Sequence, residues 1–248
     1  MSIFSKFKLK FLLQFKNIFK RTGCSAVIAA GGSSRRMDGE NKLFLLIRSK
    51  PVLAYTLEAF QKCGLIDEII VVAQEDKLDR VREICAEYGI TKAVKILLGG
   101  KTRLESVMAG VYAASDKAGV IAIHDGARPC ITEKVIRRAV TAAKIHNSAV
   151  PAIPVTSTIK RVRDNVVVET VNRDELVEVQ TPQVFAADLI KAALTNASKK
   201  SIEITDDSMA VELLGVKVHT VEGARENIKL TTRKDILIAE AILAGAEE

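Results

Sequence analysis

The residues best suited to chemistry lie in three short segments, and each segment follows an apolar run. The first reads AAGGSSRRM over residues 29–37, with Asn41 and Lys42 just beyond it. Paired glycines allow backbone N–H groups to approach an anion, and Arg36 and Lys42 add positive charge. The segment matches neither the dinucleotide nor the P-loop fingerprint. Phosphate binding of another kind and a plain surface turn both stay open.

The second segment reads GGKTRLES over residues 99–106 and stands at an expected helix start. Its glycines again permit close backbone contact with a ligand, for which a base or a sugar is the natural class. Arg103 and Ser106 lie three residues apart and therefore share one face of the helix. A turn that carries a solvated arginine is the alternative.

The third segment reads HDGARP over residues 124–129 and directly follows the apolar run GVIAI. An aspartate at the carboxyl end of a buried parallel strand is well placed to hold a divalent metal ion, so Asp125 is a candidate ligand. Arg128 can pair with a second anion. A helix-capping role is the alternative for Asp125, and a structural role is expected for His124, because it serves no evident nucleophile.

Together the three segments supply cations and one candidate metal ligand at expected strand ends. This combination fits phosphoryl or nucleotidyl transfer, in which positioning and charge neutralisation provide most of the catalysis. Acyl transfer fits poorly, because the sequence contains no GxSxG motif and no arguable Ser-His-Asp set.

The elements that must position these residues follow an alternating pattern. Short apolar runs predict strands, and periodic apolar residues predict helices. The strands are expected at 24–30, 68–73, 93–97, 119–123, 148–153 and 216–220, and the helices at 51–62, 76–88, 102–114, 132–145, 186–196, 206–214 and 232–244. Such alternation predicts an α/β fold with a mostly parallel, doubly wound sheet.

Residues 154–184 interrupt this alternation with short β-like segments, and they predict an antiparallel arm that leaves the main sheet. There are no internal repeats and no low-complexity linker. We therefore expect one domain over residues 23–248, with the arm at about 154–184, and a separate N-terminal extension over residues 1–22.

Composition narrows the class of protein. The chain has 248 residues, of which 48% are apolar and 27% are charged, as in an ordinary globular protein and unlike a disordered or disulfide-rich one. The formal net charge is +7, but residues 1–22 hold six basic residues and no acidic one. The remainder is close to neutral, which argues against a nucleic-acid partner. The four cysteines share no metal-ligand spacing, so free thiols in a reducing compartment are expected and zinc is not supported.

The N-terminal extension has the pattern of a basic amphipathic helix. Five of the eight phenylalanines lie within a third of its circumference: Phe4, Phe7, Phe11, Phe15 and Phe19. Peripheral contact with the inner membrane surface is one interpretation. A packing extension and a helix that docks on a partner subunit are the others. Lysines interrupt any signal-peptide core, so a cleaved leader is not expected and the protein is expected in the cytoplasm.

The ordered set of motifs resembles one known family. AAGGSSRRM…NK, GGKTRLESV, HDGARP, the stretch Thr158–Lys160, QTPQVF, ITDDSMAVE and ENIKLTT occur together over about residues 24–244. They resemble the 2-C-methyl-D-erythritol 4-phosphate cytidylyltransferases of the non-mevalonate isoprenoid pathway. HDGARP differs from the family's usual HDAARP, and the glycine loop differs a little in spacing, but neither difference removes a charged group.

This resemblance implies a Rossmann-like nucleotidyltransferase fold whose β-arm exchanges contacts across a homodimer. It implies transfer of CMP from CTP to 2-C-methyl-D-erythritol 4-phosphate, with release of pyrophosphate and with Mg²⁺ as cofactor. Asp125 matches the acid near the metal. The match assigns Arg36 and Lys42 to the α-phosphate, Arg173 and Lys229 to the attacking phosphate, Ala29, Ala30, Gly31, Gly99 and Ser106 to cytosine and ribose, and Arg128, Thr158, Thr181 and Thr205 to the methylerythritol moiety.

In the family that the sequence resembles, the arm residues Thr158, Arg173 and Thr181 act on the partner subunit's site. Two rival functions stay open at this point. One is a cytidylyltransferase for ribitol 5-phosphate or another sugar phosphate, which would share the glycine loop and the lysine. The other is a nucleotide-sensing or membrane-recruited binding module, although such a module need not retain the transition-state cations.

Overall fold

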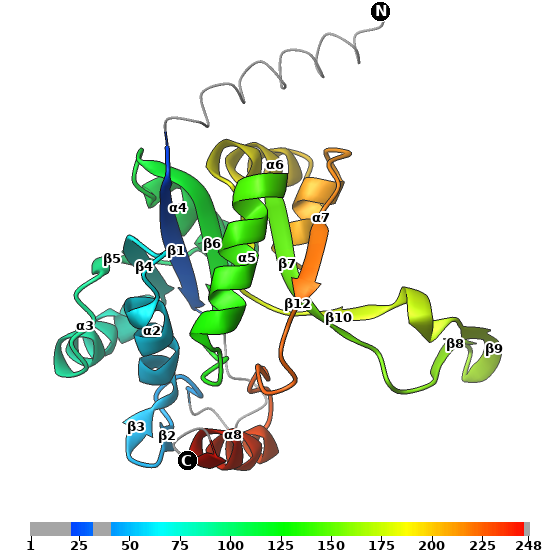
Figure 1. Cartoon of the computed structure of the whole chain (residues 1–248), viewed down its shortest axis with the longest axis horizontal. Helices are drawn as coiled ribbons and strands as arrows, with labels where there is room; N and C mark the ends of the chain where they lie inside the picture. Colours follow the sequence, from blue (N-terminus) through cyan, green and yellow to red (C-terminus); the bar gives the residue numbers. More distant parts are fainter. Residues whose placement is uncertain (1–20, 32–40, 246–248) are drawn as a thin grey trace, which may run out of the picture.

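The computed structural model describes residues 21–31 and 41–245, and these form a layered α/β body with one projecting arm (Figure 1). Arg36 and nearly all of the N-terminal extension therefore lie outside the described residues. The central sheet has eight strands in the order β10-β7-β11-β6-β1-β4-β5, with β12 also paired to β7. The expected α/β class with a mostly parallel sheet is confirmed.

Four parallel strands make up the half of the sheet that carries the candidate residues. They are β1 (Gly23–Ala30), β4 (Glu68–Ala73), β5 (Ala93–Leu98) and β6 (Ala118–Asp125). Their register sets Ala29 beside Asp125 on one side and beside Val72 on the other. Since carboxyl ends of parallel strands meet at one edge of a sheet, the segments after β1, β4, β5 and β6 converge there.

The other half of the sheet is mixed. It contains β7 (Ser148–Pro154), β10 (Val177–Val179), β11 (Gln183–Ala186) and β12 (His219–Glu222). Strand β12 runs parallel to β7, whereas β10 and β11 are antiparallel to it. Strand β12 begins three residues later than expected, because Val216 and Val218 pack against the apolar core before the strand starts.

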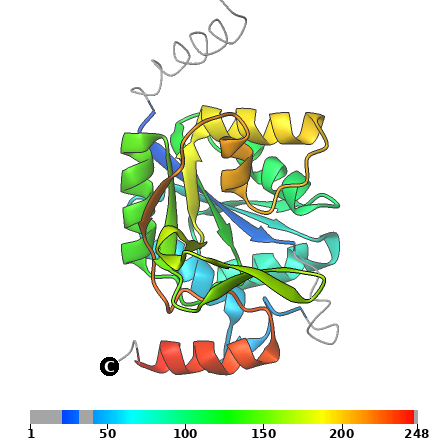
Figure 2. The same ribbon diagram turned by 90° about the vertical axis from the view of Figure 1, so that its right-hand side faces the viewer.

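Helices cover both faces of the sheet. On one face lie α2 (Val52–Lys62), α3 (Leu78–Glu87), α5 (Glu133–His146) and α8 (Arg233–Gly245); on the other lie α4 (Arg103–Ala113), α6 (Ala187–Lys199) and α7 (Asp207–Glu212). Figure 2 shows α5 and α4 on opposite sides. Alternate residues of β1 enter the two cores: Ile28 packs with the first helix set and Val27 with the second.

The arm is shorter than the sequence suggests. Strands β8 (Ile159–Arg163) and β9 (Val166–Val171) form a separate hairpin, and the short 3₁₀ helix η3 (Arg173–Glu175) leads back to the body. In Figure 1 the hairpin extends well away from the sheet. Strands β10 and β11 belong to the main sheet, because β10 pairs with β7 and β11 pairs with β6. The expected span of about 154–184 therefore included part of the central sheet.

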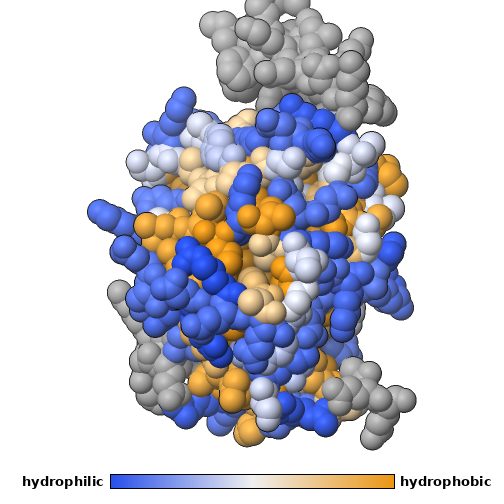
Figure 3. Space-filling model, turned by 90° about the vertical axis from the view of Figure 1, so that its left-hand side faces the viewer, coloured by the Kyte–Doolittle hydropathy of each residue, from blue (hydrophilic) through white to orange (hydrophobic). Residues whose placement is uncertain are grey.

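A second, two-stranded hairpin was not expected from the sequence. It consists of β2 (Leu46–Ile47) and β3 (Lys50–Pro51), joined by Arg48 and Ser49 with positive φ. At the sheet edge, β5 leaves Val94 and Leu98 more than half exposed, and Figure 3 shows apolar surface on this side. No described helix is long and apolar enough to cross a membrane.

The four cysteines are free and buried. Burial raises the pKa of the Cys24 thiol to about 12. It likewise raises the pKa values of Cys85 and Cys130 to about 11. These thiols remain protonated near neutral pH and behave as small apolar side chains.

Candidate active site

Asp125, the last residue of β6, is the centre of a cluster of charged side chains. Lys229 Nζ lies 2.8 Å from its Oδ2, and Arg128 Nε lies 3.7 Å from the same oxygen. Arg103 Nη2 lies 3.8 Å from Oδ1. Burial raises the pKa of the Asp125 carboxyl, but Lys229, Arg103 and Arg128 outweigh that effect and lower it to about 2. One ionised carboxylate thus faces three cations.

Arg103 is held by a second carboxylate. Its guanidinium donates to both oxygens of Asp207 at 2.8 and 2.7 Å, and Asp207 is fully buried. Burial lowers the pKa of Arg103, but the charges of Asp207 and Asp125 outweigh this effect and raise it. A two-pronged Arg–carboxylate pair fixes the orientation of the guanidinium as well as its charge. Arg103 is therefore a rigid cation at the start of α4.

The glycine segments after β1 and β5 meet around Ser106. The Ser106 hydroxyl donates to the Thr102 carbonyl at 2.9 Å and accepts from the Gly100 N–H at 3.1 Å. A Cβ at Gly99 would lie only 2.8 Å from this hydroxyl, and one at Gly31 would lie 3.8 Å from it. The family resemblance assigned Gly31, Gly99 and Ser106 to one ligand, and the structure brings the three residues together. Ser106 holds the glycine turn in shape, and at Gly99 there is no room for a side chain.

Ala29 and Ala30 end β1 between the two clusters. The Ala29 carbonyl accepts from the Gly126 N–H at 3.0 Å, directly after Asp125. Ala30 is paired with Ala73 at the end of β4, and the Ala73 carbonyl accepts from the Gly99 N–H at 2.8 Å. The end of β1 therefore joins the charged cluster to the glycine turn.

Lys42 reaches the same edge of the sheet from a different segment. Its ammonium donates to the Leu230 carbonyl at 2.7 Å, and Leu230 directly follows Lys229. The Leu230 N–H donates to the Ala127 carbonyl at 2.9 Å. Lys42 and Lys229 thus approach the site through one shared stretch of backbone. Arg36, the predicted partner of Lys42, lies outside the described residues.

Thr181 lies inside its own chain's site, which differs from the expectation that it acts on a partner. It is buried, its hydroxyl accepts from the Asp125 N–H at 3.2 Å, and it lies 3.0 Å from His124 Nδ1. The pairing of β11 with β6 brings it there. Burial lowers the pKa of His124 to about 3, so its ring is neutral and structural, as expected.

The remaining predicted residues lie further out. Thr205 is exposed just before α7, and its hydroxyl approaches Met209 Sδ at 3.7 Å. Arg173 is in the arm, where its guanidinium donates to the Thr156 carbonyl at 2.8 Å, and Thr158 is exposed at the hairpin's start. Figure 1 shows the arm that contains η3 and the β8–β9 hairpin extending away from the central sheet, to which β6 belongs.

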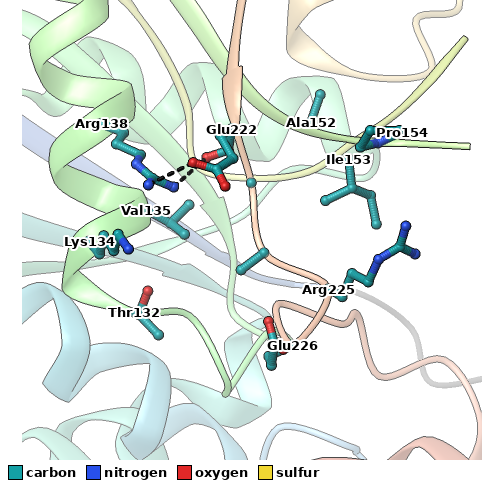
Figure 4. Close-up of a pocket in the computed structure, with 12 residues that line it drawn as sticks. Thr132, Lys134, Val135, Arg138, Ala152, Ile153, Pro154, Glu222, Arg225 and Glu226 are labelled. Atoms are coloured by element: carbon teal, nitrogen blue, oxygen red, sulfur yellow. Dashed lines mark hydrogen bonds and ion pairs between the residues drawn. The ribbon is translucent and has the colours of Figure 1, made fainter. Parts of the chain in front are cut away.

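A hollow of about 490 Å³ is lined by none of the residues of the charged cluster. It is formed by the start of α5, the end of β7 and the segment after β12 (Figure 4). The ion pair Arg138–Glu222, with atoms 2.7 Å apart, lies at one side of it. Its lining includes none of the residues that the sequence singled out.

Comparison with known proteins decides the family. The model of the 2-C-methyl-D-erythritol 4-phosphate cytidylyltransferase family matches residues 24–245. The chain belongs to this family. It is therefore a cytidylyltransferase, and the residues around Asp125 lie in a nucleotidyltransferase fold.

Relatives of the family extend over almost the same residues. The 2-C-methyl-D-erythritol 4-phosphate cytidylyltransferase of Halalkalibacterium halodurans is 47% identical over 225 residues, covering 90% of this chain and 98% of that one. The enzyme of the same name from Dehalococcoides mccartyi is 42% identical over 227 residues, covering 91% and 98%. The crystal structure of 4-diphosphocytidyl-2C-methyl-D-erythritol synthase from Anaerococcus prevotii has a TM-score of 0.81 at 30% identity, covering 92% and 99%.

The cytidylyltransferase site fits a divalent metal ion through one carboxylate. Within residues 21–31 and 41–245, no three His, Cys, Asp or Glu side chains gather into a metal-binding group. Mg²⁺ commonly takes one or two carboxylates, keeps several waters and shares the phosphates of its substrate. Asp125 Oδ1 is the less engaged oxygen, with Arg103 at 3.8 Å, whereas Lys229 holds Oδ2. The donor set therefore suits an ion held mainly by a nucleotide.

Several residues that shape the site were not predicted from the sequence. Asp207 fixes Arg103, and two buried amides, Gln180 and Asn227, bond to backbone around Thr181 and Lys229. All three occur inside motifs that carried the family resemblance. The repeated acids of ITDDSM were the one available signal for Asp207.

The low pKa of Asp125 predicts a pH-dependent contribution to stability. Because the pKa is lower in the folded protein than in the unfolded chain, ionised Asp125 stabilises the fold above about pH 4 by roughly 2 kcal/mol, and this is lost as the pH falls toward 2. Asp125→Asn should therefore lower the free energy of unfolding at pH 7, with a smaller deficit at pH 3. Urea denaturation at both pH values measures this.

Asp164→Asn is the matched control, because Asp164 is exposed in the turn of the β8–β9 hairpin. It should behave like the unmodified chain at both pH values. A deficit for Asp125→Asn that stays constant from pH 7 to pH 3 would contradict the inferred ionisation.

Proposed function

We propose that the chain transfers the cytidylyl group of CTP to 2-C-methyl-D-erythritol 4-phosphate and releases pyrophosphate, in isoprenoid precursor biosynthesis. The observation that carries this proposal is the convergence of Lys229, Arg103 and Arg128 on the one carboxylate of Asp125. Two phosphorylated reactants repel each other, and fixed cations at one edge of a sheet offset that repulsion. The four free, buried cysteines support a cytoplasmic location.

The nucleotide end of the site is assigned to the glycine turn. Backbone around Gly31 and Gly99, together with Ala29 and Ala30, would bind cytosine and ribose, because small residues let the ligand approach main-chain N–H and C=O groups. Ser106 supports these contacts through its bonds to Gly100 and Thr102. Arg36 and Lys42 would bind the phosphates and stabilise the negative charge that develops at the α-phosphate.

The alcohol phosphate is assigned to the other side of Asp125. Lys229 would orient its phosphate, with Arg128, Thr181 and Thr205 near the methylerythritol moiety. The phosphate monoester is itself the nucleophile, so no protein nucleophile or strong base is required. Asp125, through Oδ1, would hold Mg²⁺, which when bound neutralises phosphate charge and polarises the reacting phosphoryl group.

Arg173 and Thr158 would complete the site of a second copy. The arm exposes apolar side chains on its strands, with Val166 63% exposed and Val167 56% exposed. Such apolar exposure on a projecting hairpin favours burial against another protein surface. We infer a homodimer in which each arm reaches the partner's site.

Lys42→Ala should lower kcat by at least about a hundredfold, because it removes a cation that acts on the transition state. The assay is pyrophosphate release with CTP, Mg²⁺ and 2-C-methyl-D-erythritol 4-phosphate. Lys62→Ala is the control, since Lys62 is exposed on α2. Near-normal turnover by a folded Lys42→Ala enzyme would refute the assigned role.

The same assay with ribitol 5-phosphate should give little pyrophosphate, and equal rates would favour the broader sugar-phosphate enzyme.

Arg173→Ala should weaken use of the alcohol phosphate and leave CTP affinity almost unchanged. Mixed dimers of Arg173→Ala and Lys42→Ala subunits test whether the arm acts across the dimer. In an equal mixture of the two variants, half of the dimers are mixed. If the arm acts across the dimer, each mixed dimer has one intact site of two, so activity should recover to about a quarter of normal. No recovery in verified mixed dimers would contradict an exchange of arms.

We further propose that the N-terminal extension contacts an anionic membrane surface. The family match begins at residue 24, so the extension lies outside it. Its phenylalanines and six basic residues suit insertion into a lipid interface. The extension joins the start of β1, whereas the site lies at the end of β1. Three exposed lysines lie at the same end of the sheet as the start of β1. Lys144 donates to the Thr22 carbonyl, Lys117 directly precedes β6, and Lys217 shortly precedes β12.

The triple variant Phe7→Ser, Phe11→Ser, Phe15→Ser should lose vesicle binding at least about tenfold, because each phenylalanine loses apolar burial. Sedimentation of the full chain with vesicles of phosphatidylcholine and phosphatidylglycerol measures this, and pure phosphatidylcholine is the control. Equal sedimentation of variant and unmodified chain would exclude the membrane contact and leave packing on protein as the role.

A further inference from the structure

Lys229 comes from a segment that has no regular structure of its own. Residues 223–230 contain neither helix nor strand, yet the Lys229 ammonium lies 2.8 Å from Asp125 Oδ2. Groups that act on a reacting phosphate must be held to within roughly half an ångström. Since helix or strand hydrogen bonds do not supply that precision here, other contacts must hold the segment.

Asn227 supplies several of those contacts at once. It is fully buried, and its side-chain Nδ2 donates to the Thr181 carbonyl at 2.9 Å and to Gln180 Oε1 at 3.3 Å. Its own carbonyl accepts from Arg128 Nη1 at 2.6 Å. Asn227 therefore bonds to one cation of the cluster and stands two residues before another.

Gln180 holds the beginning of the same segment. Its Nε2 donates to the Ala224 carbonyl at 2.7 Å, and its Oε1 accepts from the Ala224 N–H at 3.2 Å. A Cβ at Gly223 would lie 2.5 Å from this Oε1, so the backbone is pressed against the amide. With Asn227, the segment is pinned at positions 224 and 227 before it reaches Lys229.

Both side-chain amides are tied to the loop between β10 and β11, which carries Thr181. The Gln180 N–H donates to the Pro151 carbonyl at 2.7 Å, and the Thr181 hydroxyl accepts from the Asp125 N–H. The carboxylate and the segment that delivers its lysine thus share one support. Asn227 links the two through different groups, because its backbone carbonyl accepts from Arg128 whereas its side-chain amide donates to the Thr181 carbonyl.

We propose that Asn227, seated on Gln180, is a positioning residue that sets the places of Lys229 and Arg128 on the alcohol-phosphate side of the site. This inference rests on the proposed role of Lys229. Asn227 acts through its neighbours and does not contact the substrates. Its loss affects binding and orientation of 2-C-methyl-D-erythritol 4-phosphate and spares CTP, whose assigned contacts lie on the glycine turn.

Asn227→Ala should lower kcat/KM for the alcohol phosphate about 30-fold and change KM for CTP less than about twofold, because small displacements of an orienting group cost one to two orders of magnitude. Ser148→Ala is the control. Ser148 is buried and donates to the Lys217 carbonyl at 2.8 Å, at the start of β7. Ser148→Ala should lower thermal stability, but it should not change the kinetic constants for one substrate more than for the other. Equal losses for both substrates in Asn227→Ala would overturn the proposal.

A second comparison uses the Lys229→Ala background. If Asn227 acts mainly through Lys229, adding Asn227→Ala there should cost no more than about threefold. The same 30-fold loss in that background would overturn the inference about Asn227 and leave the proposed role of Lys229 standing. Near-normal activity of Lys229→Ala by itself would overturn the proposed role of Lys229. Gln180→Ala, which leaves Asn227 in place, should give a smaller loss of the same selectivity and serves if Asn227→Ala does not fold.

Discussion

The ionised carboxylate of Asp125 is the constraint on which the rest of the site depends. It lies at the end of a fully buried strand, so its negative charge is stable only because Lys229, Arg103 and Arg128 surround it. The dependence is mutual, since three cations crowded at one sheet edge repel one another without it. The carboxylate therefore gathers cations from three separate segments of the chain and holds them at one edge of the sheet.

This arrangement explains why a cytidylyltransferase needs so little reactive chemistry of its own. The substrates supply both nucleophile and leaving group, and the protein supplies fixed charge and fixed distances. Each cation has a second anchor: Asp207 for Arg103, the Asn227 carbonyl for Arg128 and a braced segment for Lys229. Rigid donors need little reorganisation when charge develops, which is the physical basis of this kind of catalysis.

Much of the fold followed from local patterns in the sequence. The continuous apolar runs of β1, β4 and β6 reflect burial on both faces, and the glycine turn at Gly99 reflects a place with no room for a side chain. The contacts that hold the cations in place could not be predicted from local patterns. Arg103 and Asp207 are 104 residues apart, and Gln180 and Ala224 are 44 apart, so only the folded topology brings them together. The position of Thr181 was not predicted for the same reason, because pairing of β11 with β6 brings it into the site of its own chain.

The protonated state of the buried thiols has a practical consequence. Because Cys24, Cys85 and Cys130 hold their protons far above neutral pH, alkylating reagents will find scarcely any thiolate at those three positions. A new cysteine placed at the exposed hairpin turn would react much faster than these natural thiols. A spectroscopic label attached there could therefore report the position of the arm in solution with little labelling at these three thiols.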